Sequence, residues 1–228
     1  MRNVFHNLKD FLLDLVFPRE CVVCGSDESY LCWNCAYKTR ILQVQACPVC
    51  ARINANGVSC CGGYLDQLLV AADYHNNAVM PELIHLFKYK FAQDLAPILA
   101  FLLFQIFQSH VTGPTLITHV PLSKERFRYR GFNQAALLSF YSAHYSGLKH
   151  VELLNRIRHT KAQAGLSKRQ REKNLRYAFW AGDCSQIDHV TLIDDVYTTG
   201  STMQECAATL KRAGVKRVTA LVLARSFR

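Results

Sequence analysis

Two adjacent carboxylates, with a hydroxyl-rich loop after them, are the residues whose types and spacing favour chemistry most clearly. Asp194 and Asp195 end an apolar run, and hydroxyl side chains around one glycine follow: Thr198, Thr199, Gly200, Ser201 and Thr202. The backbone N–H groups of such a loop can surround a phosphate where a helix begins. Carboxylates at this position suit the hydroxyls of a ribose. The segment therefore predicts a site for the phosphate and the sugar of one ligand.

A strand and a helix must position these side chains. Residues 190–193 are apolar or β-branched without a break, which is typical of a strand buried on both faces of a parallel sheet. An amphipathic run from Met203 to Leu210 predicts a helix that begins near Ser201. The alternative is a Gly/Thr-rich turn that caps an ordinary helix beside a solvated acid. That alternative does not explain why strand, acid pair, loop and helix occur together.

A second group of candidate ligand-binding residues is basic. Residues 115–120 predict another strand, and the segment after it carries four alternating basic residues: Lys124, Arg126, Arg128 and Arg130. We expect this segment to be a loop, with a helix opened by Gly131. Guanidinium groups at the end of a parallel strand can bind a pyrophosphate through bidentate hydrogen bonds. We assign Lys88 to the same ligand; the alternative is a solvated surface loop.

The remaining apolar patterns complete an alternation of strands and helices. Strands are predicted over 68–74 and 218–223, with helices from about Pro81 and over 95–107. A short amphipathic helix is predicted over 4–17. Strands that alternate with helices specify a parallel α/β sheet.

Cysteine spacing predicts a metal-binding module before this sheet. Eight of the ten cysteines lie between Cys21 and Cys61. Three C-x-x-C pairs and one further thiol are assigned as zinc ligands: Cys21, Cys24, Cys32, Cys35, Cys47, Cys50 and Cys60. Each pair points two thiolates at one ion, and two pairs complete a structural zinc site, which leaves no open position for catalysis.

The pairing of these thiols stays open. Sequential pairing joins the first C-x-x-C to the second, whereas nested pairing joins it to the third, Cys47-x-x-Cys50. The adjacent Cys60 and Cys61 depart from the spacing of the other pairs, which puts a second zinc ion in question.

The positive charge of the chain is concentrated in one region. The formal net charge is +10, and residues 121–180 hold 13 Lys or Arg against 3 Glu, which is the whole surplus. A basic segment over 156–176 could form a hood over a phosphate site or an arm that binds a nucleic-acid backbone. The alternative is a solvated loop and helix. We assign Lys168, Arg169 and Arg171 to DNA binding.

No segment predicts export or a membrane span. The apolar run over 11–17 is short and carries Asp14, and the longest uncharged apolar run, 95–107, is shorter than the roughly 18 residues that span a bilayer. Clustered thiols without an export signal favour a cytoplasmic location.

Two resemblances sharpen these expectations. The run over 190–202 resembles the phosphoribosyl pyrophosphate signature of type I phosphoribosyltransferases. Nearly the whole chain is similar to the ComF family, also written ComFC or GntX-like. The residues that carry this similarity are Leu15-Val16-Phe17-Pro18, the thiol pairs, Ile84-His85-x-x-Lys88-Tyr89, Val120-Pro121-Leu122, Arg130-Gly131-Phe132-Asn133-Gln134, Arg171-x-x-Asn174 and Ile193 to Thr202.

The family resemblance implies a fold and a function. It implies a cysteine-rich zinc ribbon over residues 1–66 and a phosphoribosyltransferase-like domain over 67–228. It further implies phosphoribosyl pyrophosphate as ligand, with Mg²⁺, and a role in natural competence through handling of incoming single-stranded DNA, with DNA-processing proteins as partners.

Two hypotheses for the ligand site follow. In the first, the protein is an enzyme in which Asp194 and Asp195 stabilise the cationic transition state, either in DNA handling or in nucleotide or cofactor metabolism. In the second, it is a DNA-handling adaptor whose pocket senses the ligand. The sequence does not indicate the accepting nucleophile.

Overall fold

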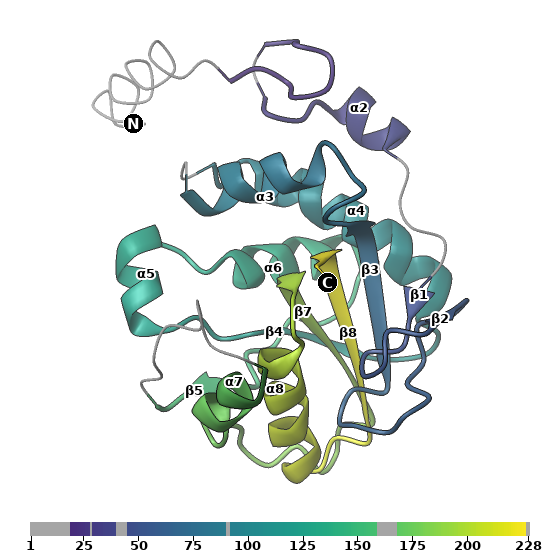
Figure 1. Cartoon of the computed structure of the whole chain (residues 1–228), viewed down its shortest axis with the longest axis vertical. Coiled ribbons are helices and arrows are strands. Elements are labelled where there is room, and N and C mark those ends of the chain that lie inside the picture. The colour runs from purple at the N-terminus through teal and green to yellow at the C-terminus, as the bar shows by residue number, and fades with distance from the viewer. Residues whose placement is uncertain (1–18, 28, 40–44, 90–91, 159–167, 227–228) are drawn as a thin grey trace. The chain divides into compact units, whose positions relative to one another are not determined.

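The computed structural model describes residues 19–27, 29–39, 45–89, 92–158 and 168–226 (Figure 1). Contacts divide the chain into two compact units, residues 1–40 and 41–228. The first two C-x-x-C pairs belong to the smaller unit, and the later cysteines belong to the larger one. The domain boundary that the sequence suggests after residue 66 stays a prediction. The helix predicted over 4–17 lies outside the described residues.

The smaller unit is a loop-rich structure organised by its cysteines. Gly25, with a φ of 70°, donates its N–H to the carbonyl of Cys21 and closes a tight turn. Glu20 and Asp27 form an antiparallel bridge around this turn. Helix α2 (Trp33–Lys38) then begins at the N-cap residue Cys32.

The larger unit is built on a four-stranded parallel sheet. Its strands are ordered β3 (Gln67–Asp73), β8 (Arg217–Arg225), β7 (His189–Tyr197) and β4 (Leu116–His119). Every neighbouring pair in the sheet is parallel, which confirms the predicted fold class. Two small antiparallel pairs accompany it: β1 (Gln45–Ala46) with β2 (Ile53–Asn54), and β5 (Asn155–Arg156) with β6 (Phe179–Trp180).

Helices cover both faces of the sheet (Figure 1). The larger unit contains α3 (Met80–Tyr89), α4 (Leu95–His110), α5 (Lys124–Arg130), α6 (Gln134–Ser146), α7 (Lys168–Leu175) and α8 (Ser201–Arg212). Of these, α4, α6 and α8 pack on the strands, α3 packs on α4, and α7 packs on α8. Helices α4 and α6 pack on each other and on the sheet. Met203 and Leu210 of α8 belong to the same buried core cluster as Leu192 and Val222 of the central strands. In the described part of the chain, no helix is long and apolar enough to cross a membrane.

The expected basic loop is a helix, so that prediction was wrong. Helix α5 begins after Ser123, whose side chain accepts a hydrogen bond from the Arg126 N–H, and it ends at Gly131 in the left-handed conformation. Gly131 therefore closes α5 rather than opening the next helix, which begins at Gln134 after the N-cap Asn133. Ser before a helix and Gly after it are ordinary start and stop signals, and they outweigh the turn-like charge pattern.

Strand β7 extends to Tyr197, four residues beyond the apolar run that predicted it. Asp194 therefore lies within the strand, and pairs in register with Val222 of β8. The regular backbone of the sheet, rather than a loop, sets where the acid pair lies.

Candidate functional site

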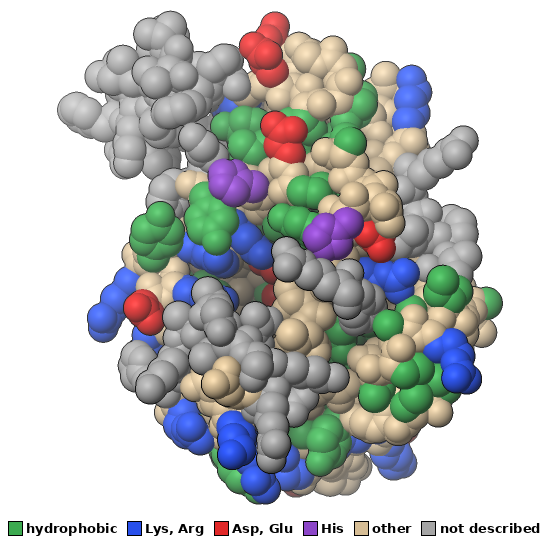
Figure 2. Space-filling model, viewed as in Figure 1, with side chains coloured by type: hydrophobic (Ala, Val, Ile, Leu, Met, Phe, Trp, Pro, Cys, Tyr) green, Lys and Arg blue, Asp and Glu red, His purple; other side chains and the backbone are tan. Residues whose placement is uncertain are grey.

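A cavity of about 480 Å³ lies at the carboxyl edge of the sheet. Figure 2 shows basic side chains beside acidic ones in a hollow of this face, and the sequence predicted most of the charged side chains that line the cavity. The predicted residues among its lining are Lys88, Arg126, Arg130, Asp194, Asp195, Thr198 and Thr202. Ligands of open α/β sheets bind at this edge, where the strands end.

Asp195 is buried and paired with a cation, and Asp194 beside it is half-buried. Asp195 is only 8% exposed, and its Oδ1 lies 2.8 Å from the Nζ of Lys88 on α3. Asp194 Oδ1 accepts the Asp195 N–H at 2.8 Å. Burial, and then the charge of Asp195, raise the pKa of Asp194 from 3.8 to about 7, against the opposing effects of that N–H, Lys88 and Arg126. The two acids thus differ in environment, as in sites where neighbouring carboxylates have different roles.

Helix α5 divides its arginines between two faces. Arg126 and Arg130 are four residues apart, so they share the face that lines the cavity. Arg128 instead lines a separate groove with Phe127 and Glu152. The structure therefore brings two of the three predicted arginines to the cavity.

Arg130 is held in place from both sides. Its guanidinium is buried, donates to Gln134 Oε1 at 3.1 Å and lies 5.3 Å from the centre of the Tyr89 ring. The Nε2 of Gln134 also lies buried at the cavity, and no group in the described residues accepts its hydrogen bond. Such an orphaned donor fits an acceptor oxygen of a ligand.

The hydroxyl-rich loop is also divided between two surfaces. Thr198 and Thr202 line the cavity, whereas Thr199 and Ser201 bond to each other at 3.0 Å and line a different groove. Gly200 has a φ of 74° and precedes α8 without a side chain to cap the helix. Gly200 itself therefore leaves the first turn of α8 without an N-cap side chain, although the Ser201 N–H donates to Thr199 Oγ1 at 3.5 Å. Helix ends of this kind are sites where anions bind.

The sequence did not assign Arg156 or Asn133 to the ligand site, although both line the cavity. Arg156, on β5, belongs to the basic segment that was assigned to a hood or an arm, and burial lowers its pKa. Asn133 donates to the Val120 carbonyl at 3.1 Å and accepts the Ala135 N–H, which ties α6 to the end of β4. Position in the basic segment was the only signal for Arg156. Lys168, Arg169 and Arg171 lie on α7, but their side chains are outside the described structure.

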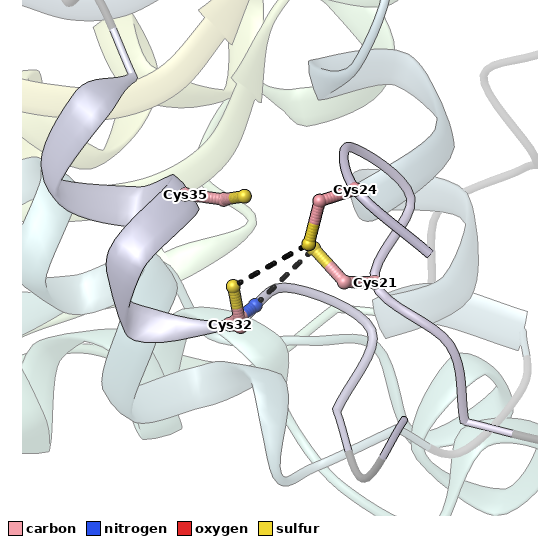
Figure 3. A group of neighbouring side chains, drawn as sticks. All are labelled: Cys21, Cys24, Cys32 and Cys35. Atoms are coloured by element: carbon pink, nitrogen blue, oxygen red, sulfur yellow. Dashed lines mark hydrogen bonds between the residues drawn. The ribbon is translucent and has the colours of Figure 1, made fainter. Parts of the chain in front are cut away.

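The cysteines form two groups of four. Cys21, Cys24, Cys32 and Cys35 form one group, and Cys47, Cys50, Cys60 and Cys61 form the other. Within each group all thiols lie within 4.8 Å of one another, and Figure 3 shows the first group converging from the turn and from α2. The pairing is therefore sequential, not nested. The second group includes Cys61, which the sequence assignment left out, so the adjacent pair does not prevent a four-thiol site.

Both groups fit structural zinc. Four sulfur ligands around one point match the closed tetrahedral coordination of such sites. Hydrogen bonds with the side chain and backbone of Ser26 lower the pKa of Cys24 to about 6, whereas a hydrogen bond with Cys32 and burial raise the pKa of Cys35 to about 12. Zinc binds the thiolate form, so metal binding releases the protons that remain on the group.

The second cysteine group is joined to the hydroxyl-rich loop. Tyr197, at the end of β7, is buried and donates its hydroxyl to the Pro48 carbonyl at 2.7 Å. The Tyr64 N–H donates to the side-chain Oε1 of Gln204 at 3.0 Å, and the backbone N–H of Gln204 donates to the Gly200 carbonyl at 2.8 Å within the first turn of α8. The backbone around these thiols therefore braces one side of the loop.

Comparison with known proteins agrees with these features. Residues 12–63 match the double zinc ribbon domain family. DNA utilization protein YhgH of Salmonella typhi is 33% identical over 223 residues, covering 86% of this chain and 97% of that protein. Competence protein ComFC of Streptococcus pneumoniae is 26% identical, covering 88% of this chain and 90% of that protein. The chain belongs to the ComF family.

The ComF chain also has a partial similarity among solved structures. The glutamine phosphoribosylpyrophosphate amidotransferase from B. subtilis has a TM-score of 0.37 and 19% identity, covering 58% of this chain and 26% of that one. The zinc ribbon match and the two thiol groups together identify zinc as the metal of the cysteine module.

Proposed function

We propose that this ComF-family protein binds phosphoribosyl pyrophosphate, with Mg²⁺, in the cavity at the end of β7. The observation that carries the proposal is a surplus of cations around an acid pair. The cavity lining has four basic side chains, Lys88, Arg126, Arg130 and Arg156, and two acidic ones, Asp194 and Asp195. Phosphates require the cations and sugar hydroxyls suit the carboxylates, so a phosphorylated sugar matches both parts.

Each part of the ligand has a matching surface. The 5-phosphate lies at Thr198, Thr202 and the N-terminus of α8, where backbone amides and the helix dipole favour an anion. Ribose hydroxyls donate to Asp194 and Asp195. The pyrophosphate lies toward Arg126 and Arg130, and Mg²⁺ would neutralise part of its charge when bound.

Lys88 lies where it can contact both the ribose-binding acids and the pyrophosphate. Its ammonium group compensates the charge of Asp195, with Nζ 2.8 Å from Oδ1. When ribose hydroxyls bind Asp195, the flexible Lys88 side chain turns toward the pyrophosphate. The cation therefore compensates a carboxylate before binding and a phosphate afterwards.

The DNA role rests on the relatives. One is named for DNA utilization and another for competence, and residues 121–180 carry the positive surplus that a polyanion requires. We propose that the protein handles incoming single-stranded DNA together with DNA-processing proteins, and that Lys168, Arg169 and Arg171 contact its backbone. We place this role in the cytoplasm, since none of the ten cysteines forms a disulfide bond.

Phosphoribosyl transfer is a second candidate function. In that reaction the bond from C1 of the ribose to the pyrophosphate oxygen breaks, pyrophosphate leaves with the electron pair, and an acceptor nucleophile bonds to C1. The position of Asp194 and Asp195 favours it, because carboxylates beside the ribose stabilise the positive charge that develops on the ring. Transfer in nucleotide or cofactor metabolism would use the same residues without a DNA role.

Calorimetry tests the binding proposal. Zinc-loaded protein is titrated with phosphoribosyl pyrophosphate, with and without Mg²⁺, and separately with ribose 5-phosphate and pyrophosphate. We expect the complete ligand to bind most tightly and only with Mg²⁺. Arg126→Gln should weaken binding, whereas Arg128→Gln, on the other face of the same helix, should not. Equal affinity for the complete ligand and for pyrophosphate alone would reject the sugar site.

A further inference from the structure

A second groove, of about 610 Å³, lies on the other side of the hydroxyl-rich loop. Thr199 and Ser201 line it from the loop, and Tyr64 and Tyr177 line it with aromatic rings. It is separate from the sugar-phosphate cavity, whose lining shares none of these residues. Its size falls within the range of ordinary small-ligand sites.

The aromatic rings of this groove are held in exposed positions. Tyr64 is 52% exposed and Tyr177 is 55% exposed. Tyr177 has a φ of 56°, a left-handed backbone that non-glycine residues rarely adopt, and its N–H donates to Glu205 Oε1 at 3.0 Å. Arg176 and Arg212 lie 5.2 and 5.3 Å from the centre of its ring. Strained backbone that presents an exposed ring is a mark of a functional surface.

The charge of the groove is positive. Lys173, Arg176 and Arg212 line it with the single acid Glu205. Glu205 bonds to Arg212 at 3.0 Å and to the Tyr177 N–H, so its carboxylate is already compensated. Lys173 and Arg176 therefore leave a surplus of positive charge beside the two rings, which favours an anionic partner with flat apolar groups.

We infer that this groove is a stacking subsite for the bases of single-stranded DNA. Tyr64 stacks on a base, while Lys173 and Arg176 contact the neighbouring phosphates. The Tyr177 ring lies beside the Arg176 and Arg212 guanidinium groups and helps to hold these cations at the groove. Stacking with nearby cations is how proteins bind single strands without reading sequence. A sugar phosphate alone would leave the rings unused, and paired bases in a duplex would not present their faces to them. The inference deepens the proposed DNA role and rests on it, but does not depend on the sugar-phosphate site.

Fluorescence anisotropy tests the subsite with two labelled probes, oligothymidylate and an abasic oligodeoxynucleotide of equal length. Tyr64→Ala should weaken oligothymidylate binding about 5- to 150-fold, the range for loss of one stacked base, and should leave abasic binding unchanged. Tyr64→Phe should bind like the wild type, because it keeps the ring. Tyr129→Ala removes a ring on α5 that is 71% exposed and outside the groove, so it serves as the matched control.

A charge variant tests the phosphate contact independently. Lys173→Gln should make the dependence of log affinity on log salt shallower by about 0.7. Equal wild-type affinity for the two probes, or full oligothymidylate binding by Tyr64→Ala, would overturn the inference. No binding of either probe would also overturn it, leaving the groove to a protein ligand. Calorimetry with phosphoribosyl pyrophosphate, run on the same samples, distinguishes this failure from failure of the sugar-phosphate site.

Discussion

Replacing Gly200 with Ala tests how the hydroxyl-rich loop is built, because a side chain at this residue would meet both an unfavourable backbone conformation and a steric overlap. Gly200 has φ 74° and ψ −6°, a left-handed backbone that costs an L-residue about 1–2 kcal/mol. A Cβ at this position would also overlap the hydroxyl and ring of Tyr197. Tyr197 is buried and bonded to Pro48, so it has little room to move, and such overpacking costs about 1–3 kcal/mol.

The expected loss for Gly200→Ala is therefore about 2–5 kcal/mol in the free energy of unfolding. Gly131→Ala is the matched control, since Gly131 has nearly the same backbone, φ 75° and ψ −13°, and a Cβ there meets nothing within 4 Å. For Gly131→Ala, the free energy of unfolding should therefore fall only by the backbone cost of about 1–2 kcal/mol. Urea denaturation of the zinc-loaded proteins measures both. Equal destabilisation by the two variants would refute the claim that Tyr197 packs directly beneath the loop.

Three further predictions follow from the site. Tyr197→Phe leaves the buried Pro48 carbonyl without its donor, so the free energy of unfolding, measured with urea, should fall by about 1–3 kcal/mol. Zinc should also be lost faster to a chelator; unchanged stability and zinc release would contradict the claim that Tyr197 joins the second cysteine group to the loop. The raised pKa of Asp194 means that the folded protein holds this proton more tightly than the unfolded chain, so stability should fall as pH rises from 3.8 to about 7. Asp194→Asn should reduce that fall, and an identical pH profile in this variant would contradict the raised pKa of Asp194. Elemental analysis should find about two zinc ions per chain, and about one after Cys47→Ser with Cys50→Ser; an undiminished zinc content in this variant would contradict the second thiol group.

The sequence predicted the parts of the site that depend on local pattern. An apolar run, two acids, a hydroxyl-rich loop and an amphipathic run lie within 25 residues of one another, so their order alone indicated strand β7, Asp194, Asp195 and helix α8. The parallel sheet followed from the alternation of such patterns.

The directions in which the arginine side chains point were harder to predict, because they depend on whether the segment is a loop or a helix. Alternating basic residues in a loop could all face one ligand, but in helix α5 they cannot. Ser123 and Gly131 form the ends of that helix, so Arg126 and Arg130 share a face while Arg128 points to another groove. Ser123 and Gly131 were therefore the sequence signals for a helix, whereas the alternating charges favoured a loop.

Contacts between distant segments left no local signal. Tyr197 bonds to Pro48, a residue 149 positions away, and Tyr64 reaches Gln204 across 140 positions. Each of these residues looks ordinary in its own segment. The role of the second cysteine group as a brace for the loop therefore became visible only in the folded chain.

A crystal structure of the zinc-loaded protein with phosphoribosyl pyrophosphate and Mg²⁺ tests the central claim most directly. The account predicts the 5-phosphate at the N-terminus of α8, ribose hydroxyls within hydrogen-bond distance of Asp194 and Asp195, and Lys88 turned from Asp195 toward the pyrophosphate. A cavity that stays empty at saturating ligand, with the Lys88–Asp195 ion pair intact, would contradict it.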